Sequence, residues 1–179
     1  MRRLQTRLLK HRKEAKMVVN IFSLINEFQD RYPVDVNGLA RALGIEVNYA
    51  YLGKDVSGMI ERTNTGSYRI TVNENDPRTR QRFTIAHELG HFIYHKDKMG
   101  EGIDDDRMYR STNVGKYHNT NIGPREETQA NKFAASLLMP MDIINQLKSD
   151  GINDCGMLAD MLDVSKHAMC IRLGEPYEG

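Results

Sequence analysis

The chain has 179 residues, of which 40% are hydrophobic and 27% are charged, and its formal net charge is +1. This length and composition predict one domain with a substantial hydrophobic core. No stretch approaches the ~18 consecutive apolar residues that a transmembrane helix needs, which excludes an integral membrane protein.

The two cysteines, Cys155 and Cys170, occur in a chain without a secretory pattern. Asn20 and Ser23 interrupt the apolar stretch that follows the basic N-terminus, and no small-residue cleavage site comes after it. The sequence therefore predicts a soluble, cytoplasmic protein whose two thiols stay reduced. A disulfide between them is the less favoured alternative in that compartment.

Positive charge is concentrated at the N-terminus, where residues 1–16 carry seven lysines and arginines against one glutamate. This segment has a net charge of +6, so the rest of the chain carries about −5. Apolar residues continue at helical spacing as far as residue 28. We interpret residues 1–32 as a helical segment with a basic extension, and residues 33–179 as the main domain. The extension lacks the interleaved aromatic residues of single-strand nucleic-acid binders, which favours a solvated helix end.

The first part of the main domain is predicted to contain a short helix, a strand and a hairpin. The helix follows a turn at Pro33 and stops at Gly44, and a strand over residues 45–51 comes next. Residues 56–62 and 67–72 then form the hairpin, because the turn residues TNTG separate them and the second strand alternates apolar with polar side chains.

Two longer helices are predicted in the second part. Asn75 or Asp76 caps the first, which has Pro77 in its first turn and continues to about residue 96. A loop over residues 97–123 follows, and its run of aspartates is interpreted as a solvated tip rather than a cation site. The second helix, residues 124–140, is bracketed by prolines, and short helices complete the tail. Together these elements predict an α+β domain in which a small twisted sheet packs beside a helical bundle.

The segment FTIAHELGHFIYH, residues 83–95, carries the strongest chemical signal. Side chains four residues apart on a helix project from the same side, so His87 and His91 can offer two imidazole nitrogens to one metal ion. Glu88 can reach a water on that ion without being a ligand, which is the arrangement of HExxH zinc hydrolases. In such enzymes the metal lowers the pKa of its water towards 7, and the glutamate accepts the proton of that water. The alternative is a pair of surface histidines, but the apolar neighbours predict burial, where unpartnered imidazoles are costly.

A catalytic zinc ion needs a third protein ligand and leaves its fourth position to water. His95 lies two turns beyond His87, roughly 12 Å along the helix axis, so the two cannot share one ion. The third ligand is therefore expected from another element. The helix that begins at Pro124 offers Glu126 and Glu127 in its acidic first turn.

Two motifs together resemble one known family. HELGHFIYH, followed about thirty residues later by EETQANKFAASLLMP, resembles the ImmA/IrrE-type metallopeptidases, and VDVNGLARALGIEV is similar to their opening helix and strand. The resemblance covers roughly residues 33–175. It implies a zincin-like, gluzincin-type fold with the HExxH helix in the core. It also implies a zinc cofactor, Glu88 as the catalytic base, and metal ligands at His87, His91 and Glu127.

The resemblance implies a cytoplasmic zinc endopeptidase that cleaves a helix–turn–helix transcriptional repressor or another regulatory protein. An alternative is a metal-containing protein that sequesters a repressor or antitoxin without cleaving it. A DNA-binding regulator is a third possibility, because residues 158–173 have helix–turn–helix spacing. Residues 142–179, however, hold seven acidic residues against three basic ones, which argues against direct DNA binding.

Several supporting roles stay open at this point. Asn131 lies one turn beyond Glu127 and matches a position that can orient a ligand. His95 has three interpretations: a hydrogen bond at the helix end, a substrate contact, or a pH-sensitive group near a ligand. The sequence does not choose an oxyanion-stabilising group from the candidates His118, Tyr109 and Tyr117.

Overall fold

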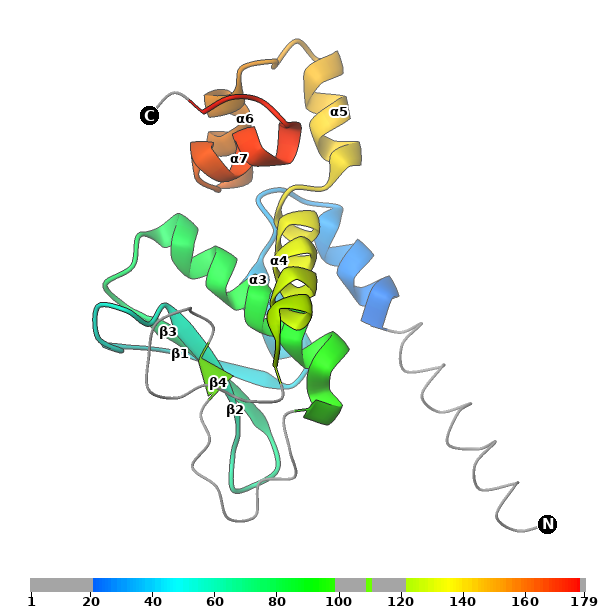
Figure 1. Ribbon diagram of the computed structural model, residues 1–179. Coiled ribbons are helices and arrows are strands. Elements are labelled where there is room, and N and C mark those ends of the chain that lie inside the picture. The colour runs from blue at the N-terminus through cyan, green and yellow to red at the C-terminus, as the bar shows by residue number, and fades with distance from the viewer. Residues whose placement is uncertain (1–20, 99–108, 111–121, 178–179) are drawn as a thin grey trace, which may run out of the picture.

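The computed structural model describes residues 21–98, 109–110 and 122–177 and has the predicted α+β architecture. Residues 21–29 are helical. The elements that follow are α2 (Val36–Ala42), β1 (Ile45–Ala50), β2 (Gly58–Arg62), β3 (Tyr68–Asn73), α3 (Arg78–His95), the short 3-10 helix η1 (Lys96–Lys98), β4 (Tyr109–Arg110), α4 (Pro124–Leu138), α5 (Met141–Ser149), α6 (Cys155–Leu162) and α7 (Lys166–Leu173). In Figure 1, α3 and α4 lie beside the sheet, and α5, α6 and α7 gather beyond the C-terminal end of α4.

The sheet contains four strands in the order β1–β3–β2–β4. The predicted hairpin is confirmed, because β2 and β3 pair in antiparallel fashion with Ile60 opposite Ile70. β1 pairs with β3 in parallel, and β4 adds two residues alongside β2. Ile60, Ile70 and Val72 are fully buried, and they share one face because strand side chains alternate.

Helix α3 lies in the centre of the core, as predicted. Ile85, Ala86 and Leu89 are fully buried in a cluster that also includes apolar residues of the sheet and of α4. Complete burial of an Ile or Leu side chain is worth ~1.5–3 kcal/mol, so these contacts hold the helix in place. His87 and His91 occupy the same helical turns, and the fold therefore carries their imidazoles into the interior as well.

The start of α3 differs from the prediction. Pro77 occupies the N-cap position without a side-chain hydrogen bond, so neither Asn75 nor Asp76 caps the helix. Asp76 instead pairs with Arg80 at 3.5 Å. The backbone N–H of Asn75 donates to the side chain of Asn73 at 3.2 Å. The carboxylate of Asp76 thus faces a side chain of the first turn of α3 and accepts no backbone N–H group of the helix.

Helices α3 and α4 approach each other closely at Gly90. A methyl group on Gly90 would lie 3.1 Å from the Cα atom of Ala130 and 3.1 Å from a ring carbon of Phe133. The absence of a side chain lets the two backbones come together at this point. Glu127 precedes Ala130 by less than one helical turn, so the same approach brings Glu127 towards α3.

Gly90→Ala is therefore expected to lower the melting temperature, although alanine favours a helix over glycine by ~1 kcal/mol. The added methyl group would push α4 away by a few tenths of an ångström. Such overpacking typically costs about 1–3 kcal/mol, so we expect a net destabilisation of up to ~2 kcal/mol. Thermal unfolding followed by circular dichroism measures the difference. A variant that melts above the wild type would show that α4 accommodates the methyl group freely.

The tail forms the predicted short helices. Asp154 caps α6 by accepting the backbone N–H of Met157, and Ser165 caps α7 by accepting that of Ala168. The turn between the two helices contains Asp163 in a left-handed conformation, with φ at 51°.

The two cysteines are paired in this structure, so the prediction of two separate thiols is wrong. Cys155 and Cys170 form a disulfide with their Cα atoms 6.0 Å apart. Cys155 is the first residue of α6 and Cys170 lies in the second half of α7. The short turn between the helices folds α7 back along α6, which brings residues 15 positions apart in the sequence together.

The N-terminal segment is described only from residue 21 onwards. Ile25, within the helical residues 21–29, is buried and belongs to the same core cluster as α3. The basic extension of residues 1–16 lies outside the described part of the chain, and the proposed boundary at residue 32 stays a prediction.

Candidate metal centre

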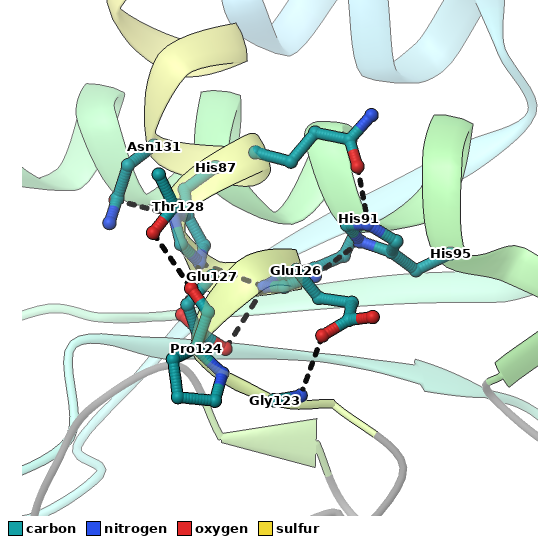
Figure 2. Close-up of polar contacts among 10 residues, drawn as sticks. His87, His91, His95, Gly123, Pro124, Glu126, Glu127, Thr128 and Asn131 are labelled. Carbon is teal, nitrogen blue, oxygen red and sulfur yellow. Dashed lines mark hydrogen bonds and ion pairs between the residues drawn. The ribbon is translucent and has the colours of Figure 1, made fainter.

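The structure brings together the three side chains that were proposed as metal ligands. His87 and His91 project from α3, and Glu127 projects from the first turn of α4 (Figure 2). The Nε2 atoms of the two histidines lie 2.9 Å apart. Glu127 Oε2 is 3.3 Å from His87 Nε2, and Glu127 Oε1 is 3.4 Å from His91 Nε2.

These separations fit a single zinc ion. Zinc binds histidine nitrogen and carboxylate oxygen at ~2.0–2.2 Å in tetrahedral geometry, which places neighbouring ligand atoms roughly 3.3 Å apart. The distances of 2.9, 3.3 and 3.4 Å lie close to that value. Two imidazole nitrogens and one carboxylate also form a ligand set found in catalytic zinc sites of peptidases. The donor atoms are therefore suited to zinc both in kind and in spacing.

The two neighbouring glutamates of α4 have different environments. Glu127 is half-buried and faces the histidines, whereas Glu126 pairs with Lys98 and accepts the backbone N–H of Gly123 at 3.0 Å (Figure 2). One helical position rotates a side chain by about 100°, which explains why the two cannot share a direction. Glu126 therefore stabilises the start of α4, while Glu127 completes the candidate ligand set.

Hydrogen bonds fix the orientation of both imidazoles. The Nδ1–H group of His87 donates to Asn131 Oδ1 at 2.9 Å, because the amide oxygen can only accept. On the other side, the Nε2–H group of His95 donates to Gln129 Oε1 at 3.2 Å. His95 Nδ1 is then free to accept the Nδ1–H group of His91 at 3.1 Å. These partners leave the Nε2 atom of each histidine facing Glu127, where it can carry a proton or bind a metal ion.

His95 is thus placed by the structure as the partner of His91, and it is 4% exposed. The sequence offered three interpretations of His95: a hydrogen bond at the helix end, a substrate contact, or a pH-sensitive group near a ligand. The bond to His91 joins the end of α3 to a candidate ligand, so it fits the first interpretation and the position that the third requires. Gln129 was not singled out in the sequence. Its position two residues after Glu127 gives no signal by itself, because the contact with His95 depends on how α4 packs on α3.

The three groups influence one another's protonation. Burial acts to raise the pKa of Glu127, but hydrogen bonds from His87 and His91 outweigh it and hold that pKa at about 2. Burial also acts to lower the pKa of His87, yet the two nearby glutamates raise it above its ordinary value. The pKa of His91 is lowered, mainly by burial. Protons and a metal ion compete for the same nitrogens, so metal binding weakens as the pH falls.

Glu88 lies beside the ligands but bonds to none of them. Its carboxylate is 1% exposed, and neither oxygen has a hydrogen-bond partner among the described residues. Burial raises the pKa of Glu88 to about 8, while the charge on His87 opposes the rise and that on Glu127 adds to it. A cation held by the three ligands would favour the ionised carboxylate. Such a carboxylate can accept a proton at neutral pH.

Replacing His95 with alanine is expected to weaken zinc binding by about 10- to 100-fold, the usual effect of removing the hydrogen-bond partner of a ligand histidine. His95→Asn should lose less, because its amide oxygen can accept the His91 Nδ1–H group from nearly the same place. Competition with a chromophoric chelator measures both affinities. Equal affinities for the wild type and for His95→Ala would show that His91 needs no partner.

The proposed oxyanion-stabilising groups are not located. Tyr117 and His118 lie outside the described residues, and Tyr109 is described only through its backbone in β4.

In residues 21–98 and 122–177, no helix has the length and apolar character needed to cross a membrane.

A solved structure of a Mycobacterium tuberculosis transcriptional regulator has a similar fold. The match has a TM-score of 0.58 and 18% sequence identity, and it covers 88% of this chain and 47% of that one. This chain therefore spans about half the length of the regulator. A search among curated proteins found no match at a significant level.

A family model matches most of the chain. The model describes the IrrE N-terminal-like domain, a peptidase family, and it covers residues 40–174. The matched region runs from α2 to the end of α7 and includes both helices that carry the candidate metal ligands. The fold agrees with the zincin-like architecture that the sequence predicted. The chain belongs to the peptidase family of the IrrE N-terminal-like domain.

Proposed function

We propose that this protein is a zinc-dependent endopeptidase that cleaves a helix–turn–helix transcriptional repressor or another regulatory protein. The observation that carries the proposal is the buried carboxylate of Glu88, which has no partner among the described residues and lies next to a three-ligand metal site. Burial of a carboxylate without a hydrogen-bond partner lowers the stability of the folded state. A buried group whose pKa is shifted from its ordinary value is typical of a catalytic acid or base.

In this proposal, each residue of the site has a separate role. His87, His91 and Glu127 would hold the ion, while Asn131 and His95 keep the two imidazoles oriented. When bound, zinc polarises a carbonyl group and makes water acidic enough to attack near neutral pH.

Glu88 acts as the general base and then as the general acid. It removes a proton from the attacking water as the new bond to the carbonyl carbon forms. It then delivers that proton to the amine nitrogen as the peptide bond breaks. The side chain is buried among the packed residues of α3, so its position is fixed before the substrate arrives.

The substrate class rests on the resemblance to the ImmA/IrrE-type metallopeptidases. A direct test is to incubate the zinc-loaded protein with a purified candidate helix–turn–helix repressor and to measure intact masses. We expect two complementary fragments, their loss with a chelator, and their return when zinc is added. A repressor that is bound but stays intact under all these conditions would support sequestration in place of cleavage.

A further inference from the structure

A cleft of about 490 Å³ separates α3 from α7 and reaches the metal centre. Arg80, Phe83 and His87 line one wall, and their spacing places them on one face of α3. His167 and Ile171 of α7 line the opposite wall. Pockets that enclose ligands commonly measure ~300–1,000 Å³. Because His87 belongs both to the cleft and to the metal site, a molecule in the cleft lies beside the reacting centre.

Helix α7, the second helix of the helix–turn–helix arrangement formed with α6, turns exposed side chains towards the cleft. In DNA-binding proteins, exposed residues of the second helix enter the major groove. Here the corresponding exposed residues, His167 and Ile171, face the cleft instead. Ile171 is 67% exposed, and its side chain offers no hydrogen bond to a base edge. With the net negative charge of residues 142–179, this surface is better suited to a protein segment than to DNA.

Ion pairs hold α7 at a fixed position relative to α3. Asp163, in the turn before α7, accepts from Arg78 Nε at 2.8 Å and from Arg82 Nε at 3.1 Å. Arg82 Nε also donates to the backbone carbonyl of Asp163 at 3.0 Å, and Arg82 is buried. On the other side of the tail, Arg172 donates to the carbonyl of Met139 at 3.1 Å. These contacts connect the turn before α7 to α3, and α7 itself to the end of α4.

The lining of the cleft indicates what it can bind. Phe83, Ala168 and Ile171 provide apolar surface, while Thr79 and Ser165 provide hydroxyl groups. An extended peptide needs both kinds of contact, because its backbone requires hydrogen-bond partners and an apolar side chain requires a dry surface.

We propose that the cleft between α3 and α7 binds the substrate polypeptide on one side of the bond to be cleaved. The bound residue that faces α7 carries a large apolar side chain, and Ile171 determines this preference. The proposal rests on the proposed peptidase function, since it assigns the cleft to the substrate of the same metal site.

Two peptide hydroxamates provide the probe, because the hydroxamate binds zinc and the attached residue reports on the cleft. They are identical except for leucine or glycine next to the hydroxamate, and each is made with the peptide on either side of that group. Calorimetric titration of the full, zinc-loaded chain measures their affinities. In one of the two orientations the leucine compound should bind about tenfold tighter or more, because its side chain leaves water.

Ile171→Glu should reduce this leucine-to-glycine ratio to near one while the zinc content stays unchanged. Met157→Glu is the matched control, because Met157 is 55% exposed on the neighbouring helix α6 and does not line the cleft. It should retain the wild-type ratio. The proposal is overturned if Ile171→Glu keeps the ratio, or if the wild type shows no preference in either orientation.

Failure of the cleft proposal can be distinguished from failure of the proposed peptidase function. If the chain takes up no zinc, or cleaves no protein, the peptidase proposal fails. The cleft is then tested with leucine and glycine peptide amides by following the methyl resonances of Ile171. A response to the leucine peptide alone supports the peptide cleft. A response to neither overturns it, and so does displacement of the leucine peptide by a DNA duplex.

Discussion

Glu88→Gln is expected to keep the fold and about one zinc ion per chain, while the rate of peptide-bond hydrolysis falls by about 10²–10⁴-fold. Glutamine has nearly the same shape as glutamate but cannot accept a proton from water, and this range is typical for loss of a general base. The carboxylate has no hydrogen-bond partner in the described structure, so its replacement breaks no bond that holds α3. Zinc content by atomic absorption and single-turnover cleavage of the substrate measure the two effects separately.

The effect on the regulated genes distinguishes an enzyme from a sequestering protein. If proteolysis is the function, Glu88→Gln should no longer relieve repression, even though it still binds both zinc and the repressor. Relief of repression at the wild-type level, with no fragment of the repressor detected, would contradict the proposed role of Glu88. In that event the zinc site would serve only to maintain the fold.

Glu127→Ala is expected to abolish stoichiometric zinc binding, whereas Glu126→Ala should retain it. The first change removes one of three protein ligands, and the remaining two histidines supply only half of a tetrahedral shell. The second change removes the pair with Lys98 and the bond to Gly123, which affects the start of α4. Equilibrium dialysis followed by metal analysis gives the stoichiometry for each variant.

Glu126→Ala is a demanding control because the two glutamates are adjacent and equally charged. Its melting temperature should fall by a few degrees at most, since a single helix-end interaction is worth ~1 kcal/mol. Full zinc occupancy in Glu127→Ala, together with loss in Glu126→Ala, would reverse the assignment of the third ligand.

The sequence predicted the parts of the structure that depend on short-range spacing. The four-residue interval between His87 and His91 determines their common direction once the segment is helical, and burial of α3 follows from its apolar neighbours. The hairpin was predictable for the same reason, because alternation and turn residues lie within a short stretch. The choice of Glu127 required more, since the first turn of α4 offers two carboxylates and only packing on α3 decides between them.

Features that depend on contacts between distant segments could not be predicted. The bond between His95 and Gln129 joins two helices, and nothing in either helix specifies it alone. The cap of α3 was assigned wrongly because the helix begins one residue later than expected, with Pro77 at the N-cap and Asp76 paired with Arg80. The pairing of the two cysteines follows from the way α7 folds back along α6, which spacing alone does not reveal.

The burial of α3 leads us to expect that the lifetime of the protein depends on its metal content. Without an ion, the interior contains the imidazoles of His87 and His91 beside the carboxylate of Glu88, which has no hydrogen-bond partner among the described residues. Burying these groups lowers the stability of the native state. An ion that binds only the native state adds stability, by ~4 kcal/mol at a thousandfold excess over its dissociation constant. Chains that lose the ion open more often, and cellular proteases degrade opened chains. We therefore expect degradation to leave a surviving population that is enriched in metal-loaded chains.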